Sequence, residues 1–161
     1  MRYFCVFLLL CTLGLGAEKK TAVERFGFTG PEIFPIGEQV GSLRAADLNG
    51  DGRIDLALAH PEKIRVYWAE ESRIKLEHPL EIAAEVRHLA AGDLNRDKHP
   101  DLVAVGPEQV MVFDGTPRGP AAIANTVLDI STPAQAAVAD LNRDGWPDLA
   151  VAVTERMGNE Y

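Results

Sequence analysis

The sequence predicts an all-β fold built from repeated sheets, and three observations support this prediction. A nine-residue pattern, Asp-Leu-Asn-x-Asp-x-x-x-Asp, occurs at residues 47–55, 93–101 and 140–148. The copies start 46 and 47 residues apart, a period typical of solenoids, arrays and propellers. Pro and Gly recur between the copies and leave little room for long helices.

Each copy of the pattern has the same two neighbours. Short segments of small residues come before it, at residues 43–46, 88–92 and 136–139. Continuous apolar runs come after it, at residues 56–59, 102–105 and 149–153. Such runs are typical of strands that are covered on both faces. We therefore expect the pattern to be a loop between two strands.

Two further strands complete each unit. A third strand is predicted at residues 64–68 and 110–113, nine residues after the last Asp of the loop. A weaker fourth strand is predicted at residues 33–36, 80–82 and 128–130, and Pro35 marks the first of these as an edge strand. Four short strands in a unit of this length are typical of a β-propeller blade, whose crowded inner part suits the small residues beside the loops. The chain therefore predicts about two and a half four-stranded blades, as the N-terminal part of a larger propeller or as a truncated product.

The first 17 residues resemble an export signal. Arg2 supplies a positive start, residues 6–10 an apolar core, and Gly14, Gly16 and Ala17 small residues for cleavage. A membrane anchor is the alternative, but it needs about 20 apolar residues, more than this stretch contains. A bacterial lipoprotein site at Cys11 is a minor alternative.

Export implies a secreted, periplasmic or cell-surface protein. The expected division is a signal peptide at 1–17, an N-terminal segment at 18–31, and repeats at 32–77, 78–124 and 125–161, the last incomplete. Cys5 and Cys11 are the only cysteines and both lie in the leader, so the exported chain would contain no disulfide. A net charge of −8 without a basic cluster disfavours nucleic acid and anionic membrane surfaces as partners.

The loops themselves predict metal binding. Acids at loop positions 1, 5 and 9 and an Asn at position 3 place four oxygen donors around one point, which suits a hard cation such as Ca²⁺. Tight turns without metal are the alternative, but turn chemistry does not explain a fixed acid at position 9. An EF-hand loop is excluded because it needs an acid at position 12, which here is Leu58, Ala104 or Val151.

With the stretch Asp47-Leu-Asn-Gly-Asp-Gly-Arg-Ile-Asp55-Leu and its two partners, the chain resembles the FG-GAP repeats, also called VCBS repeats, known from the β-propeller of integrin α subunits. The similarity covers residues 33–153, although the name-giving Phe-Gly and Gly-Ala-Pro elements are poorly kept. The resemblance implies blades with Ca²⁺ in the loops, usually in a seven-bladed ring. By spacing and by this resemblance, the ligands are four side chains and the backbone carbonyl of position 7 in each loop: Asp47, Asn49, Asp51, Asp55 and the Arg53 carbonyl; Asp93, Asn95, Asp97, Asp101 and the His99 carbonyl; Asp140, Asn142, Asp144, Asp148 and the Trp146 carbonyl.

The second loop is expected to be the weakest site. Lys98 stands where the other loops have Gly52 and Gly145. If this position needs a positive φ, a Lys costs on the order of 1 kcal/mol.

The sequence shows no catalytic constellation, because the four histidines occupy unrelated repeat positions and are expected at the surface or at strand ends. Tyr67 and Trp68 would suit a sugar or protein ligand, but core packing is favoured. We therefore expect a secreted, calcium-binding propeller module that binds a protein or a polysaccharide and is not itself an enzyme. One alternative is the propeller part of an extracytoplasmic enzyme, a polysaccharide lyase or a hydrolase, with catalytic residues outside this chain. Another is a truncated relic without a stable fold.

Overall fold

The computed structural model describes Ile33, Ile36 and residues 39–71, 73–75 and 79–154. The chain divides into two compact units, Met1–Gln39 and Val40–Tyr161, and every strand of the described residues lies in the second. These residues contain strands and loops and no helix, so the predicted all-β class is confirmed. A search of them for a helix long and apolar enough to cross a membrane finds none.

Sheet 1 has four strands in the order β1-β2-β3-β6, with antiparallel neighbours. Its strands are β1 (Ser42–Ala46), β2 (Asp55–His60), β3 (Lys63–Tyr67) and β6 (Leu80–Ala83). A short hairpin of β4 (Ala69–Glu70) and β5 (Arg73–Ile74) lies between β3 and β6 in the chain. The sequence did not predict this hairpin.

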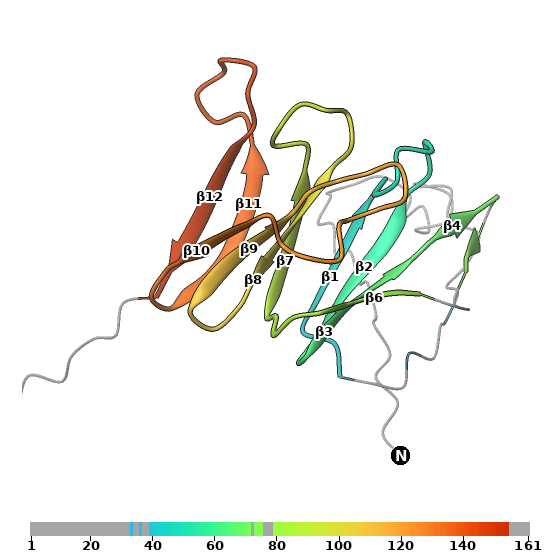
Figure 1. Cartoon of the computed structure of the whole chain (residues 1–161), viewed down its shortest axis with the longest axis horizontal. Helices are drawn as coiled ribbons and strands as arrows, with labels where there is room; N and C mark the ends of the chain where they lie inside the picture. Colours follow the sequence, from blue (N-terminus) through green and yellow to red (C-terminus); the bar gives the residue numbers. More distant parts are fainter. Residues whose placement is uncertain (1–32, 34–35, 37–38, 72, 76–78, 155–161) are drawn as a thin grey trace, which may run out of the picture. The chain divides into compact units, whose positions relative to one another are not determined.

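Sheets 2 and 3 repeat the arrangement (Figure 1). Sheet 2 has the order β10-β9-β8-β7, and its strands are β7 (His88–Gly92), β8 (Asp101–Val105), β9 (Gln109–Phe113) and β10 (Thr126–Asp129). Sheet 3 pairs β11 (Pro133–Ala139) with β12 (Asp148–Val153). Within the described residues, the sheets do not close into a ring.

The two strands that flank each loop, and the third strands predicted at residues 64–68 and 110–113, are found within a few residues of their expected bounds. The predicted fourth strand is found as β6 and β10, the edge strands of sheets 1 and 2. The expected strand at 33–36 lies largely outside the described residues, and neither Ile33 nor Ile36 is in a strand. β6 lies in the predicted repeat at residues 78–124 but is the last strand of sheet 1. The predicted repeats and the sheets are therefore out of phase, since they start at different points of the chain.

The pairing register is equivalent in all three sheets. Ala46 pairs with Asp55, Gly92 with Asp101, and Ala139 with Asp148. The last Asp of each loop is therefore the first residue of the second strand of its sheet. Each loop joins the first strand, which is β1, β7 or β11 and is called the inner strand below, to that second strand. Figure 1 shows the three loops at the same edge of the sheets.

Apolar side chains of neighbouring sheets pack together in shared clusters. Between sheets 1 and 2, Leu89, Leu102 and Phe113 pack in one cluster with Ala57 and Ala59. A second cluster joins sheet 2 to sheet 3; it includes Ala90, Val103, Val105, Val110, Val112, Ala136, Val138, Leu149 and Val151. All five residues of β8 are buried, as expected of a strand covered on both faces.

Tyr67 and Trp68 contribute to packing. Tyr67 is buried, and Trp68 is half-buried against the cluster between sheets 1 and 2. A Cβ atom at Gly119 would overlap the ring of Trp68, so the turn at Gly119 lies directly on the indole. The preference for core packing over an exposed aromatic platform is therefore confirmed.

The inner strands are joined by equivalent side-chain contacts. The N–H of Leu89 donates to Ser42 Oγ at 3.2 Å, and the N–H of Ala136 donates to His88 Nδ1 at 3.3 Å. Ser42 and His88 begin β1 and β7, and each accepts from the inner strand of the next sheet. The guanidinium of Arg44 lies 3.4 Å from His88 Nε2.

These contacts make the stability of the chain depend on the protonation of His88. Burial, and then the charge of Arg44, lower the pKa of His88 below its ordinary value of 6.5. The unfolded chain therefore binds a proton at His88 more readily than the folded chain does. The stability that neutral His88 contributes is lost as pH falls from about 6.5 through the lower pKa of the folded state. We expect urea unfolding free energies to decrease over this range, and the decrease to be smaller in His88→Gln; an equal slope in both proteins would contradict this role.

Candidate metal loops

Side-chain oxygens at positions 1 and 3 of each loop accept one shared backbone amide, that of position 5. In the loop at residues 47–55, Asp47 Oδ1 and Asn49 Oδ1 both accept the N–H of Asp51, each at 3.0 Å. Asp47 Oδ2 accepts the N–H of Gly52 at 2.8 Å, and Asp51 Oδ1 accepts that of Arg53 at 2.8 Å. The loops at residues 93–101 and 140–148 repeat all four hydrogen bonds. The structure thus brings positions 1, 3 and 5 together in each loop.

Position 9 has a different environment from the other ligand positions. Asp55 and Asp101 are 0% and 1% exposed. Asp55 Oδ2 accepts the N–H of Leu48 at 3.0 Å and its Oδ1 that of Ala69 at 2.8 Å. Asp101 accepts in the same way from Leu94 at 2.8 Å and Gly115 at 2.7 Å. Each carboxylate therefore joins the start of its loop to the chain just beyond the third strand.

The hydrogen bonds of Asp55 and Asp101 give position 9 a structural role that is separate from metal binding. A fixed acid at position 9 was attributed to metal binding alone, whereas Asp55 and Asp101 also satisfy two backbone amides. Burial raises the pKa of both carboxyl groups, and the amide hydrogen bonds oppose that rise. At the exposed position 5, the N–H of Arg53 lowers the pKa of Asp51.

Two positions in every loop have a left-handed backbone. The φ angles at position 4 are 75° at Gly50, 61° at Arg96 and 64° at Arg143, and those at position 6 are 85° at Gly52, 76° at Lys98 and 86° at Gly145. The requirement for positive φ at position 6 is therefore confirmed, and Lys98 adopts the strained conformation. The same requirement at position 4 was not predicted.

Lys98→Gly is expected to stabilise the chain by about 1 kcal/mol, because glycine adopts positive φ without the steric cost of a Cβ atom. Urea unfolding in a chelating buffer measures this change without any contribution from metal. Lys75→Gly, at a half-buried position of ordinary φ, is the control and should not stabilise. Equal effects of the two substitutions would contradict backbone strain at Lys98.

Neighbouring loops contact one another through positions 4 and 7. A Cβ atom at Gly50 would lie 3.0 Å from His99 Nδ1, so His99 packs closely against the preceding loop. At the next pair of loops, the guanidinium of Arg96 lies over the ring of Trp146, 4.7 Å from its centroid. The Trp146 ring remains 52% exposed. Cation–π contacts at exposed sites contribute about 0.5–1 kcal/mol, so this contact stabilises the pairing of the two loops modestly.

As a donor set, the loops fit a hard cation. Each offers three carboxylates, one amide oxygen and a backbone carbonyl, without sulfur or ring nitrogen among the ligand atoms. In the conformation described, the side-chain oxygens of positions 1, 3, 5 and 9 accept backbone N–H groups. Within residues 39–71, 73–75 and 79–154, no three acidic, histidine or cysteine side chains lie close enough together to hold a metal ion.

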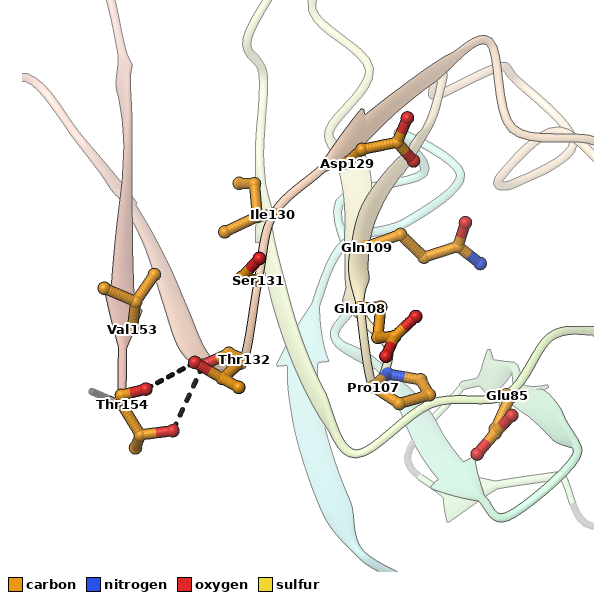
Figure 2. Close-up of a pocket in the computed structure, with 10 residues that line it drawn as sticks. All are labelled: Glu85, Pro107, Glu108, Gln109, Asp129, Ile130, Ser131, Thr132, Val153 and Thr154. Atoms are coloured by element: carbon orange, nitrogen blue, oxygen red, sulfur yellow. Dashed lines mark hydrogen bonds between the residues drawn. The ribbon is translucent and has the colours of Figure 1, made fainter. Parts of the chain in front are cut away.

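A hollow of about 1050 Å³ lies away from the loops, between sheets 2 and 3. Figure 2 shows Val153 and Thr154 on one side and Gln109, Glu108 and Asp129 on the other. Sequence reasoning did not find this hollow, because its walls come from strand ends with no shared motif.

The stacked antiparallel sheets, the equivalent registers and the three equivalent loops define a β-propeller-type repeat protein. The sequence pattern of the family described as FG-GAP-like repeat matches residues 47–104 and again residues 93–151. These matches span more than half of the chain, which therefore belongs to the FG-GAP-like repeat family. A comparison with curated proteins found no match.

Proposed function

We propose that this chain is an exported propeller-repeat module in which Ca²⁺ bound to the loops stabilises the fold, and that it binds a protein or a polysaccharide. The observation that carries the proposal is the threefold recurrence of one oxygen-rich loop at one edge. Side-chain oxygens at positions 1 and 3 share the backbone N–H of position 5 in all three loops. Export rests on residues 1–17, which lie outside the described residues.

The residues that would hold calcium are those at positions 1, 3, 5, 7 and 9. The ion would supply charge neutralisation, because three carboxylates within nine residues repel one another. Position 9 is able to act in both roles, since a carboxylate oxygen has more than one lone pair and can accept an amide and face a cation together. Extracellular modules typically bind calcium with a Kd of roughly 10⁻⁴ to 10⁻³ M, which suits a structural ion.

Exposed apolar side chains on the loops support a binding role. Ile54, Leu141 and Trp146 are all more than half exposed, and each belongs to a metal loop. Large exposed apolar groups gathered at one edge are typical of interaction surfaces. Trp146 offers a ring suited to a sugar or to a protein side chain.

Isothermal titration of the full chain with CaCl₂ tests the metal assignment. We expect three ions per chain and two for Asp144→Ala, because that substitution removes the position 5 ligand of one loop. Lys75→Ala, outside the loops, is the control and should keep three. Unchanged stoichiometry in Asp144→Ala would count against the ligand assignment.

A further inference from the structure

The chain contains four places where an Asn or Asp is followed by Gly. They are Asn49-Gly50, Asp51-Gly52, Asp114-Gly115 and Asp144-Gly145. At such a pair the backbone nitrogen of the glycine can attack the side-chain carbon Cγ of the residue before it, because glycine has no side chain to hinder ring closure. The product is a five-membered succinimide ring. In a folded chain, this attack is controlled by what holds the N–H of the glycine.

Three of the four glycine N–H groups donate to a carboxylate of another residue. Gly52 donates to Asp47 Oδ2 at 2.8 Å, Gly115 to Asp101 Oδ1 at 2.7 Å, and Gly145 to Asp140 Oδ2 at 2.9 Å. The nitrogen must lose its proton before it attacks, and a negative acceptor beside it disfavours that loss. The fold therefore protects these three pairs.

The N–H of Gly50 has a different environment. In the first loop, side chains accept the N–H groups of positions 2, 5, 6 and 7, and among the described residues no acceptor meets that of Gly50 at position 4. Gly50 is exposed, so hydroxide and water reach its nitrogen. Asn49 is also uncharged, and its Cγ is attacked more readily than that of an ionised Asp. This pair therefore combines an accessible nitrogen with a reactive side chain.

The second and third loops offer a direct comparison. Asn95 and Asn142 hold the same position 3, and their Oδ1 atoms accept the position 5 N–H just as Asn49 Oδ1 does. They are followed by Arg96 and Arg143 in place of a glycine. The side chain of an arginine hinders ring closure, so these two asparagines are expected to react slowly.

The amide nitrogen that leaves in the reaction is also held differently. In the second and third loops it donates to the carboxylate of position 5, at 3.0 Å from Asn95 and 2.9 Å from Asn142. In the first loop, Arg53 Nη1 donates to the equivalent Asp51 Oδ2 at 3.3 Å, and Asn49 shares this carboxylate. The amide of Asn49 therefore competes with a guanidinium for its acceptor.

Packing between loops favours the glycine at position 4 of the first loop. Gly50 has a φ of 75°. A Cβ atom there would lie 3.0 Å from His99 Nδ1 and 3.3 Å from His99 Cε1, so a larger residue would require His99 to move. The contact with the next loop thus keeps the residue that makes Asn49 reactive.

We propose that Asn49 is a site of spontaneous deamidation in the folded chain. The nitrogen of Gly50 loses its proton to hydroxide and bonds to Asn49 Cγ, the Cγ–Nδ2 bond breaks, and Nδ2 takes up protons from water and leaves as ammonia. Water then opens the ring. Cleavage at Cγ gives aspartate, and cleavage at the backbone carbonyl carbon gives isoaspartate, whose main chain is one CH₂ longer. The whole reaction consumes one water and releases one ammonia.

Both products change the first loop. In aspartate, the neutral amide of position 3 becomes a carboxylate, and in isoaspartate the main chain between positions 3 and 4 lengthens as well. The second and third loops keep their amides, so the three loops become unequal as the protein ages. The reaction needs no metal, so it is measured in a chelating buffer and its outcome is independent of the proposed calcium binding.

Peptide mass spectrometry of the full chain, incubated folded at mildly alkaline pH, tests the proposal. We expect the deamidated fraction to grow at least about tenfold faster at Asn49 than at Asn95 or Asn142, because only Asn49 precedes a residue without a side chain. Isoaspartate at residue 49 identifies the ring, since direct hydrolysis of the amide gives aspartate alone. Equal rates at the three asparagines, or aspartate without isoaspartate, would overturn the proposal.

The same chain unfolded in guanidinium chloride tests the protection by the fold. Unfolding removes the carboxylates from the other three glycine N–H groups, so isoaspartate should form faster in denaturant than in the folded chain at Asp51, Asp114 and Asp144. Asn49 should react in both states. Reaction of Asn49 in denaturant alone, or equal rates at the three Asp residues in both states, would contradict the proposed control by hydrogen bonding.

A pair of variants isolates the role of the glycine. Gly50→Ala combined with His99→Ala adds a Cβ atom at position 4 and removes the ring that it would meet. Deamidation of Asn49 is expected to slow by about tenfold in this variant, because the methyl group hinders ring closure. His99→Ala alone is the matched control and should leave the rate unchanged. Equal rates in the two variants would show that the glycine is not what makes Asn49 reactive.

Discussion

Asp101→Ala is expected to lower the free energy of unfolding by about 3 kcal/mol, even when no metal is present. The substitution leaves the N–H groups of Leu94 and Gly115 without their acceptor in a buried site. Each unsatisfied buried polar group costs about 1–3 kcal/mol. Urea unfolding in a chelating buffer measures this loss, because the buffer removes any difference in calcium binding between the two proteins.

Asp148→Ala is the matched control for this prediction. Asp148 holds the equivalent position but accepts one backbone amide among the described residues, and it is less buried. We expect its substitution to cost about 1 kcal/mol. Equal losses in the two variants would show that the buried pair of amides at Asp101 is not what the carboxylate stabilises.

Calcium is expected to raise the free energy of unfolding by roughly 4 kcal/mol. With a Kd near 10⁻⁴ M and about 1 mM calcium, each site contributes about 1.4 kcal/mol. This is a large share of the ~5–15 kcal/mol that stabilises a typical domain. Thermal unfolding of the full chain should show Tm higher by roughly 15 °C in calcium than in chelator at matched ionic strength.

The matched control is a chain with Asp51→Ala, Asp97→Ala and Asp144→Ala. These side chains lie on the exposed side of the loops, so the substitutions remove a ligand from each site without opening the core. The triple variant should unfold at the same temperature in both buffers. Mg²⁺ should also have a smaller effect on the parent chain, because it demands a stricter octahedral geometry. A parent chain whose Tm does not change with calcium would reduce the loops to turns.

The strands could be predicted because their determinants are local. Apolar runs such as residues 102–105 directly follow a recognisable loop, and the repeat aligns their partners. The β4–β5 hairpin escaped prediction because strands of two residues leave no periodic pattern. β11 begins at Pro133, three residues before the apolar segment that indicated it, and its register shifts between Pro133 and Gln135.

The candidate site was predictable in its residue types and only partly in its roles. Positions 1, 3 and 5 lie within five residues of one another, so their convergence follows from spacing. The partners of Asp55 lie seven residues before it and fourteen after it, at Leu48 and Ala69, and that distance is set by strand pairing. The positive φ at Arg96 and Arg143 was hidden because neither residue is a glycine.

The out-of-phase relation between sequence repeat and sheet bears on how the chain folds. Sheet 1 is complete between Ser42 and Ala83, and sheet 2 between His88 and Asp129, so every pairing is made over a short stretch of chain. Pairings that close short loops cost less chain entropy than pairings between distant segments. Each sheet also packs on its neighbours in sequence, so stability is coupled from one unit to the next, as in a one-dimensional array. During synthesis, all four strands of sheet 1 are made before β7, so sheet 1 has its complete set of strands before the first strand of sheet 2 exists.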